Sequence, residues 1–345
     1  MTKEESSCED TWGGPNEARA LAAEAWSGFE WAVRTEAPGL PPPLPRRHRL
    51  IGTVLRALAY AAVGVALFIG GWWARGALEG ESSSSDGLMA AVFPEDGVTL
   101  DVRWGDLPRR LAENGVIEVE KFTVAAENAG SPLTAEQLQV LANGSDAPLR
   151  IDADSAYFVL DVLWALGLAN KNPILTEGPL VQNGREEAAR YASTGGWTIG
   201  AKPGPEYLAA LELVSLTPKQ QAVVDDVAFH SYRPCCGNIT AFPDCNHGMA
   251  ALGLVELMAQ QGATTDDIFE ALKKVSPFWF PEQYHHLATY FQGQDQRWDE
   301  VDPRLVMGND YSSASGWEQV NAWLLREGLL TDGRPGGGKA GGCAP

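Results

Sequence analysis

An uncharged apolar run between two arginines limits the architectures open to this chain. Residues 57–74, ALAYAAVGVALFIGGWWA, contain no charged side chain and are bounded by Arg56 and Arg75. With residues 50–55 the apolar body reaches about 25 residues, or roughly 37 Å as a helix. Tryptophans at one end and arginines at the other form the belts typical of a bilayer segment. The sequence therefore predicts one transmembrane helix over residues 49–75.

The residues on the two sides of this run predict its orientation. Three arginines lie at positions 46–49, whereas acidic residues predominate at positions 79–86. Basic residues favour the cytoplasmic side of a membrane, so the N-terminus is predicted to be cytoplasmic and the chain from about residue 80 onward extracytoplasmic. The polar segment before the run is too long for a cleavable signal peptide. We expect a single-pass anchor in the cell membrane.

The predicted cytoplasmic tail, residues 1–48, contains one amphipathic segment. Residues 16–34 are rich in alanine and place Leu21 and Phe29 on one apolar stripe. Acidic side chains on the same helix make an anionic lipid surface a poor partner. The segment therefore predicts a docking helix for a cytoplasmic protein partner, with a marginal free helix as the alternative.

Small residues at positions 62, 66 and 70 lie on one face of the predicted membrane helix. Such a stripe lets two helix backbones approach closely. It predicts a homo- or hetero-oligomer formed through the transmembrane helix.

The charge of the chain argues against one class of partner. The 26 lysines and arginines against 45 acidic residues give a net charge of −19. A surface that follows nucleic-acid phosphates would be a local exception to a repulsive field, so no nucleic-acid partner is predicted. Residues 76–88, which include a run of four serines, are predicted to link the membrane helix to the outer part of the chain.

Residues 89–332 are predicted to form a helical extracytoplasmic domain, so the fold class is mainly α. Thr134 and Thr217 each precede a glutamine by three residues, a capping-box pattern, and the second helix should end close to His230. Residues 154–168 carry apolar side chains at helical spacing and predict a core helix. There is little alternation with a period of two, which disfavours a sheet-based fold.

Two further helices are predicted toward the C-terminus. Thr264 or Thr265 opens a helix that should stop before Pro277, because proline interrupts the hydrogen bonding of a helix. A last helix is predicted near residues 316–327. The glycine-rich residues 333–345 are predicted to be a disordered tail.

Three of the five cysteines lie within eleven residues of the predicted outer domain. Sulfur and imidazole donors select Cu(I) or Zn(II) over Mg(II) or Ca(II). Because free thiols tend to oxidise outside the cell and a methionine thioether is close by, copper is favoured over zinc. The sequence predicts a membrane-anchored protein that binds, senses or transfers a soft metal, with no catalytic residue assigned. The candidate ligands are Cys235, Cys236, Cys245 and His247, with His230 or Met249 completing the set.

The local pattern predicts how these ligands are held. Asp244 is a candidate N-cap for a helix that starts with Cys245, and free amides and the dipole of a first turn favour a thiolate. Cys245 and Met249 share a helix face, whereas His247 points elsewhere. All three can bind one ion only if the first turn is irregular, which Gly248 permits.

Other readings of the cysteines remain open. A structural disulfide could join Cys245 to Cys235 or Cys236 and stabilise the loop between them. A disulfide between the adjacent Cys235 and Cys236 is sterically awkward. A thiol–disulfide oxidoreductase would use Cys245 as the attacking thiol and Cys235 or Cys236 as the resolving thiol. A third class is an interaction scaffold with purely structural cysteines.

One stretch resembles a known family. Pro234-Cys235-Cys236-Gly237, followed by Asp244-Cys245, resembles extracytoplasmic proteins named for a Pro-Cys-Tyr-Cys-Gly-Cys motif, which also carry a later Asp-Cys and a nearby histidine. The resemblance covers a short stretch around residues 234–245. It implies an exported, cysteine-rich protein with the capacity to bind metal.

Overall fold

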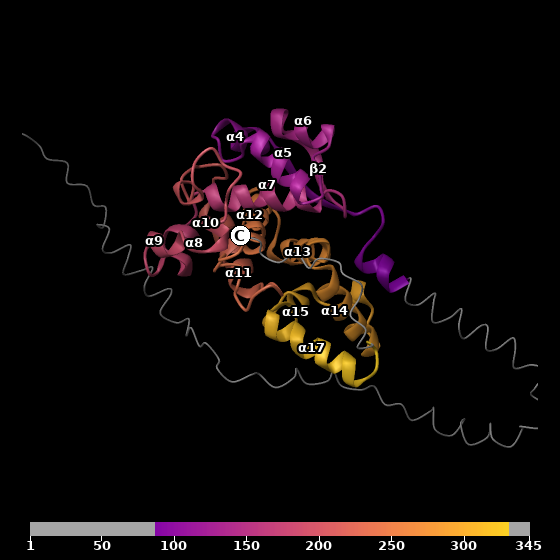
Figure 1. The fold of residues 1–345 in the computed structure, drawn as a ribbon. Coiled ribbons are helices and arrows are strands. Elements are labelled where there is room, and N and C mark those ends of the chain that lie inside the picture. Colours follow the sequence, from indigo (N-terminus) through magenta and orange to yellow (C-terminus); the bar gives the residue numbers. More distant parts are fainter. Residues whose placement is uncertain (1–86, 331–345) are drawn as a thin grey trace, which may run out of the picture. The chain divides into compact units, whose positions relative to one another are not determined.

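The computed structural model describes residues 87–330, which form a mainly helical fold with one pair of strands (Figure 1). The predicted mainly α fold class is confirmed for this part of the chain. The cytoplasmic tail 1–48, the transmembrane helix 49–75, linker residues 76–86 and the tail 333–345 lie outside the described residues. Within the described part, none of the helices has both the length and the apolar character needed to cross a membrane.

The elements described below follow a first helical segment at residues 87–92. The first half contains β1 (Val98–Gly105), α4 (Leu107–Glu113), α5 (Val119–Asn128), α6 (Ala135–Asn143), β2 (Ser145–Ile151), α7 (Ala156–Ala169), α8 (Pro173–Thr176), η2 (Pro179–Val181), α9 (Arg185–Ala188), α10 (Ala192–Gly195) and η3 (Gly204–Glu206). The second half contains α11 (Pro218–His230), α12 (Asn246–Gln260), α13 (Thr265–Trp279), α14 (Pro281–Gly293), η4 (Trp298–Glu300), α15 (Pro303–Val306), α16 (Asn309–Ser312) and α17 (Ala314–Arg326). The η elements are single turns of 3-10 helix.

The strands β1 and β2 pair antiparallel and form a two-stranded sheet. Along β1 the buried side chains are Leu100, Val102 and Trp104, and the residues between them are exposed. This is the period-two alternation of a strand with one buried face. The fold is not sheet-based, as expected, but this local alternation is a strand signal that the sequence reading did not use.

The helices α7 and α12 form the centre of the described part. Nearly every residue of α7 is buried, so the predicted core helix is covered on all sides. The two helices pack against each other through Gly167 and Gly253. A Cβ on Gly167 would lie only 2.0 Å from the carbonyl oxygen of Met249, and one on Gly253 only 2.3 Å from that of Leu163. The two backbones therefore touch where no side chain larger than hydrogen fits.

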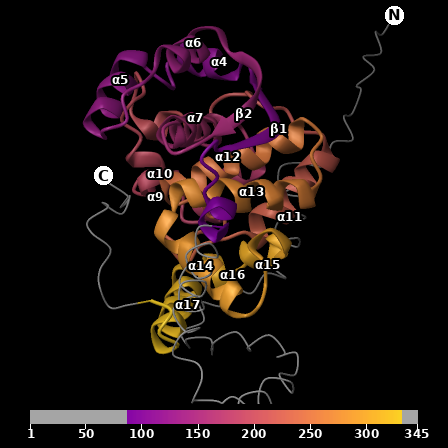
Figure 2. The same ribbon diagram turned by 90° about the vertical axis from the view of Figure 1, so that its right-hand side faces the viewer.

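The neighbours of α12 place its N-terminus inside the fold. Figure 2 shows α12 beside α7, with α11 and α13 on its other side, and α14 to α17 grouped together. The chain enters α12 directly from the loop at residues 231–244, which follows α11. The cysteine-bearing segment thus lies between packed helices.

Several predicted helix starts are confirmed, and one predicted end is wrong. Both capping boxes form, at Thr134 and Thr217, and α11 ends at His230 as predicted. α13 begins after Thr264 but runs through Pro277 to Trp279. Proline removes one helical hydrogen bond, but Pro277 and Trp279 are buried, and their packing outweighs that loss.

Candidate metal centre

The loop between α11 and α12, residues 231–244, folds back over the start of α12. Ser231, where the loop begins, is joined to Thr240: their hydroxyl groups lie 2.8 Å apart and their backbones are also hydrogen bonded. Tyr232 and Ile239 form an isolated antiparallel bridge next to this contact. This hairpin-like path returns the chain to the end of α11 and carries Cys235 toward Cys245.

Arg233 is the organising side chain of this loop. Only 4% of it is exposed, yet it carries a guanidinium with five N–H donors. Its Nη2 donates to the carboxylate of Asp244, and its Nε donates to Sγ of Cys245 across 3.0 Å. The remaining partners are backbone carbonyl oxygens at 2.9–3.2 Å, on Asn238, Ile239 and Phe242. One buried cation therefore fixes the loop and contacts a candidate ligand.

The charge of Arg233 is held by the anionic groups around it. Burial alone would lower the pKa of Arg233, but the neighbouring Cys245 sulfur and the Asp244 carboxylate raise it above its ordinary value. The guanidinium consequently stays charged. A buried charge is tolerated only when it is paired and hydrogen bonded, which is the arrangement here.

Gly248, in the first turn of α12, makes room for the guanidinium. A Cβ at this position would lie 2.4 Å from Cζ of Arg233. The sequence suggested that this glycine permits an irregular turn. In the structure, the absence of a side chain at Gly248 instead lets Arg233 lie directly against the helix.

Cys245 is the N-cap of α12. The predicted cap, Asp244, is wrong by one residue, because Asp244 is engaged by Arg233 while Sγ of Cys245 accepts from the backbone N–H of Gly248 at 3.4 Å. The sulfur therefore faces two donors, a helix amide and a guanidinium. Both favour the thiolate, the form that binds metals and exchanges disulfides.

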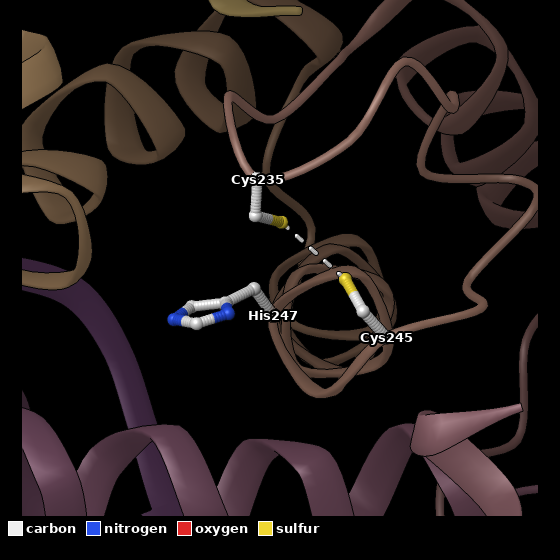
Figure 3. A group of neighbouring side chains, drawn as sticks. All are labelled: Cys235, Cys245 and His247. Carbon is white, nitrogen blue, oxygen red and sulfur yellow. Dashed lines mark hydrogen bonds between the residues drawn. The ribbon is translucent and has the colours of Figure 1, made fainter. Parts of the chain in front are cut away.

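Cys235 and His247 complete a three-residue group around this sulfur (Figure 3). Sγ of Cys235 lies 3.5 Å from Sγ of Cys245, and the ligand atoms of all three residues lie within 4.8 Å of one another. Two sulfur ligands at about 2.3 Å from a tetrahedral ion are separated by roughly 3.8 Å. The group thus has the size of a soft-metal site before any ligand moves.

His247 offers a ring nitrogen that is otherwise unused. Only 5% of the residue is exposed, and among the described residues its buried Nδ1 has no hydrogen-bond partner. The ring packs against Phe280, with centroids 4.5 Å apart, and lies edge-on to Trp279. An unpartnered buried nitrogen is costly, and a bound ion would satisfy it.

Cys236 belongs to a second group of ligand atoms, which shares Cys245 with the first. Cys236, Asp244 and Cys245 form a second group of atoms within 4.8 Å of one another. The carboxylate of Asp244 is already bound by Arg233 and by the side-chain amide of Asn238. Of this second group, the Cys236 thiol is therefore the better candidate for a further ligand.

The pKa values of the Cys236 thiol and the Asp244 carboxyl are both shifted by their surroundings. The pKa of Cys236 is lowered by a hydrogen bond with Cys235, but the bond with Cys245 and burial together raise it to about 11. Burial raises the pKa of Asp244 more than the Arg233 guanidinium lowers it. Cys236 is thus a thiol at neutral pH until something replaces its proton.

His230 and Met249, the other two predicted ligands, have different surroundings. His230 is exposed, and its Nδ1 lies 2.7 Å from the carbonyl oxygen of Asp226 and 3.2 Å from its carboxylate. Neither group of ligand atoms includes it. Met249, on α12, is fully buried and belongs to the apolar core. The structure thus brings Cys235, Cys236, Cys245 and His247 into one region and gives His230 a separate partner.

Sequence reasoning missed Arg233. Arginine is nearly always exposed, so a single arginine in a loop is ordinarily assigned to the surface. The available signal was its position, with a carboxylate, Asp244, in a loop otherwise rich in apolar and small residues. The aromatic contacts of His247 with Trp279 and Phe280 join distant segments and had no local signal.

Comparison of the chain with protein-family models, with curated proteins and with solved structures finds no match. The resemblance to the Pro-Cys-Tyr-Cys-Gly-Cys proteins is untested and stays a prediction that rests on residues 234–245.

Proposed function

We propose that this protein binds a soft metal ion through Cys235, Cys245 and His247, in order to sense it or hand it on. The observation that carries the proposal is the convergence of two sulfurs and an imidazole nitrogen within 4.8 Å, on a histidine whose buried Nδ1 has no partner among the described residues. Sulfur and imidazole donors favour Cu(I) and Zn(II). Metal binding also accounts for the buried His247 nitrogen, which a purely structural role leaves unsatisfied.

Exposure of the ligands supports exchange of the ion rather than permanent burial. Cys235 is exposed, whereas Cys245 and His247 are buried. An incoming ion or a partner's ligand would meet Cys235 first and then the two inner ligands. Such a graded path suits a protein that takes up and releases its ion.

The number of donors distinguishes copper from zinc. Cu(I) accepts three soft ligands, and Cys235, Cys245 and His247 supply them. Structural zinc is four-coordinate and would need a fourth ligand, for which Cys236 is the nearest thiol candidate. A Cys236→Ser variant should therefore keep Cu(I) affinity and lose Zn(II) affinity.

The test is metal analysis of the full-length, detergent-solubilised protein, purified without chelator and titrated with Cu(I) and Zn(II) separately. We expect one ion per chain, with affinity lowered by at least about tenfold in Cys245→Ser and in His247→Phe. Phenylalanine keeps the ring packing beside Phe280 while removing the ligand. His230→Ala is the matched control and should bind as the wild type does. Absence of binding, or an equal loss in His230→Ala, would contradict the proposal.

We further propose that residues 49–75 anchor the protein in the cell membrane, with the helical domain outside the cytoplasm. The apolar length and the basic residues before it support this topology. Cys8 and Cys343 then lie on opposite sides of the membrane. A membrane-impermeant maleimide applied to intact cells should label Cys343 and leave Cys8 unlabelled until the cells are opened. Labelling of Cys8 in intact cells would contradict the topology.

Two partner interfaces belong to the same proposal. A cytoplasmic protein would dock on residues 16–34, and the small residues at positions 62, 66 and 70 would pair membrane helices. Deletion of residues 16–34 should abolish the first interaction, and Ala66→Leu should reduce cross-linking between copies.

A further inference from the structure

The sulfurs of Cys235 and Cys245 are close enough to form a disulfide bond after a small movement. Cys235 Sγ and Cys245 Sγ lie 3.5 Å apart, and both residues are reduced in this structure. A small shift of the loop side chain would bring them to bonding distance. Cys236 is a poorer partner for Cys235, because adjacent cysteines hold their Cα atoms about 3.8 Å apart, closer than most disulfides allow.

The two thiols differ in access. Cys235 is exposed on the loop, whereas only 5% of Cys245 is exposed. An external disulfide can therefore reach Cys235 but not the inner sulfur. Exposure thus reverses the order of attack expected from the sequence, in which Cys245 attacked first.

The inner sulfur is equipped to act as a resolving and leaving group. It accepts hydrogen bonds from the Arg233 Nε at 3.0 Å and from the Gly248 backbone at 3.4 Å. Donors of this kind stabilise a thiolate while it attacks and also when it is expelled. They are held by burial and by the loop hydrogen bonds, so they need no rearrangement.

We propose that Cys235 and Cys245 form a thiol–disulfide exchange couple whose substrate is a low-molecular-weight disulfide, with Cys235 attacking first and Cys245 resolving. Exchange is a different activity from metal binding and needs no ion. It uses two of the three ligands in the proposed function. The oxidised pair carries no thiolate, so disulfide formation and metal binding exclude each other on one chain.

The chemistry balances without another reagent. The Cys235 thiolate attacks one sulfur of the substrate, forms a mixed disulfide and releases the first substrate thiolate. The Cys245 thiolate then attacks Sγ of Cys235, forms the internal disulfide and releases the second. Two protein cysteines lose two electrons, the substrate disulfide gains them, and the two protons of the protein thiols pass to the released thiolates through water.

The experiment uses full-length protein in which Cys8 and Cys343 are replaced by serine, stripped of metal and incubated with glutathione disulfide. Alkylation of remaining thiols and peptide mapping then identify each product. We expect a Cys235–Cys245 disulfide, with Cys236 still alkylated. Cys245→Ser should accumulate a glutathione adduct at Cys235, because the resolving thiol is missing. Cys235→Ser should form adducts at least about tenfold more slowly. His230→Ala, which lies outside both groups of ligand atoms, should form the internal disulfide at the rate of the parent protein.

Three outcomes would overturn the inference: no adduct at Cys235 in Cys245→Ser, a disulfide that joins Cys236 instead, or adducts that form equally fast at Cys245 in Cys235→Ser. Metal titration of the same samples separates the two proposals. Loss of exchange with intact metal binding removes only the exchange couple. Intact exchange without metal binding removes only the metal site. If both hold, protein loaded with Cu(I) should resist glutathione disulfide until the ion is chelated.

Discussion

The Nε of Arg233 donates a hydrogen bond to Sγ of Cys245 across 3.0 Å, inside a loop where the arginine is almost entirely buried. The same guanidinium is paired with Asp244. The cation and the sulfur therefore depend on each other. The guanidinium needs hydrogen-bond acceptors and a carboxylate in order to stay buried, and its donor favours the thiolate form of the Cys245 sulfur.

Replacing Arg233 with methionine should destabilise the protein strongly. The substitution removes the cation and leaves the half-buried Asp244 carboxylate without its main partner. Breaking a buried ion pair on one side costs roughly 3–5 kcal/mol in unfolding free energy, which urea denaturation would measure. The double variant Arg233→Met with Asp244→Asn should recover part of this loss. If the double variant is destabilised by the sum of the two single losses, the pairing is not the cause.

Replacing Gly248 with alanine should weaken metal binding without a comparable change elsewhere in α12. The new Cβ would meet the guanidinium carbon at 2.4 Å, so Arg233 must move away from Cys245. We expect a loss of Cu(I) affinity of about tenfold or more, measured by competition with a chromophoric chelator. Gly237→Ala is the control, because a Cβ there meets nothing within 4 Å. Equal affinity of the two variants would show that the arginine contact does not matter.

Gly167→Ala and Gly253→Ala, at the contact between α7 and α12, should each lower the free energy of unfolding. The added methyl groups at Gly167 and Gly253 would lie 2.0 and 2.3 Å from backbone carbonyl oxygens, and backbone atoms cannot yield as a flexible side chain does. Overpacking of this kind costs about 1–3 kcal/mol, and more where helices must separate. Thermal or urea unfolding measures the loss, again with Gly237→Ala as the neutral reference. A loss below about 0.5 kcal/mol would show that the two backbones do not touch as described.

Stability should fall as pH rises because of the buried Asp161. Burial raises its pKa to about 7, although a hydrogen bond with Tyr157 opposes the shift. Between about pH 4 and pH 7 the folded state retains a proton that the unfolded chain has released, so stability decreases with pH by up to roughly 1.4 kcal/mol per unit for this one group. Glu256, fully buried with its pKa also raised by burial, adds in the same direction.

Asp161→Asn isolates this contribution. Asparagine carries no titrating proton, so the variant should show a flatter dependence of unfolding free energy on pH and a gain over the wild type above about pH 7. Asp101→Asn, on the exposed side of β1, serves as the control for loss of a carboxylate. An unchanged slope in Asp161→Asn would contradict the buried, protonated carboxyl.

The parts of the fold that sequence could predict are those encoded locally. Capping boxes at Thr134 and Thr217 depend on residues three positions apart, and both helices begin where expected. The extension of α13 past Pro277 was not predictable in this way, because it depends on the burial of Pro277 and Trp279 against other segments. The rule that proline ends a helix predicted the wrong C-terminus for α13, because tertiary packing outweighs the loss of one hydrogen bond.

The candidate site also has a part that local sequence could predict and a part that depends on tertiary contacts. Cysteine spacing placed Cys235, Cys236 and Cys245 together, and the helix start brought His247 beside them. The buried arginine could not be inferred from the spacing, because its burial depends on three loop carbonyls, one carboxylate and a glycine acting together. His230 was assigned by proximity in sequence, but it lies at the exposed end of α11 and pairs with a carboxylate one turn earlier.

The most direct test of the metal centre is X-ray absorption at the copper edge of the Cu(I)-loaded, full-length protein. The account predicts a first coordination shell of two sulfur ligands and one nitrogen ligand. In His247→Phe the nitrogen should disappear while the sulfurs remain. A coordination shell of nitrogen and oxygen alone, or one unchanged in Cys245→Ser, would contradict the assignment of Cys235, Cys245 and His247 as the ligands.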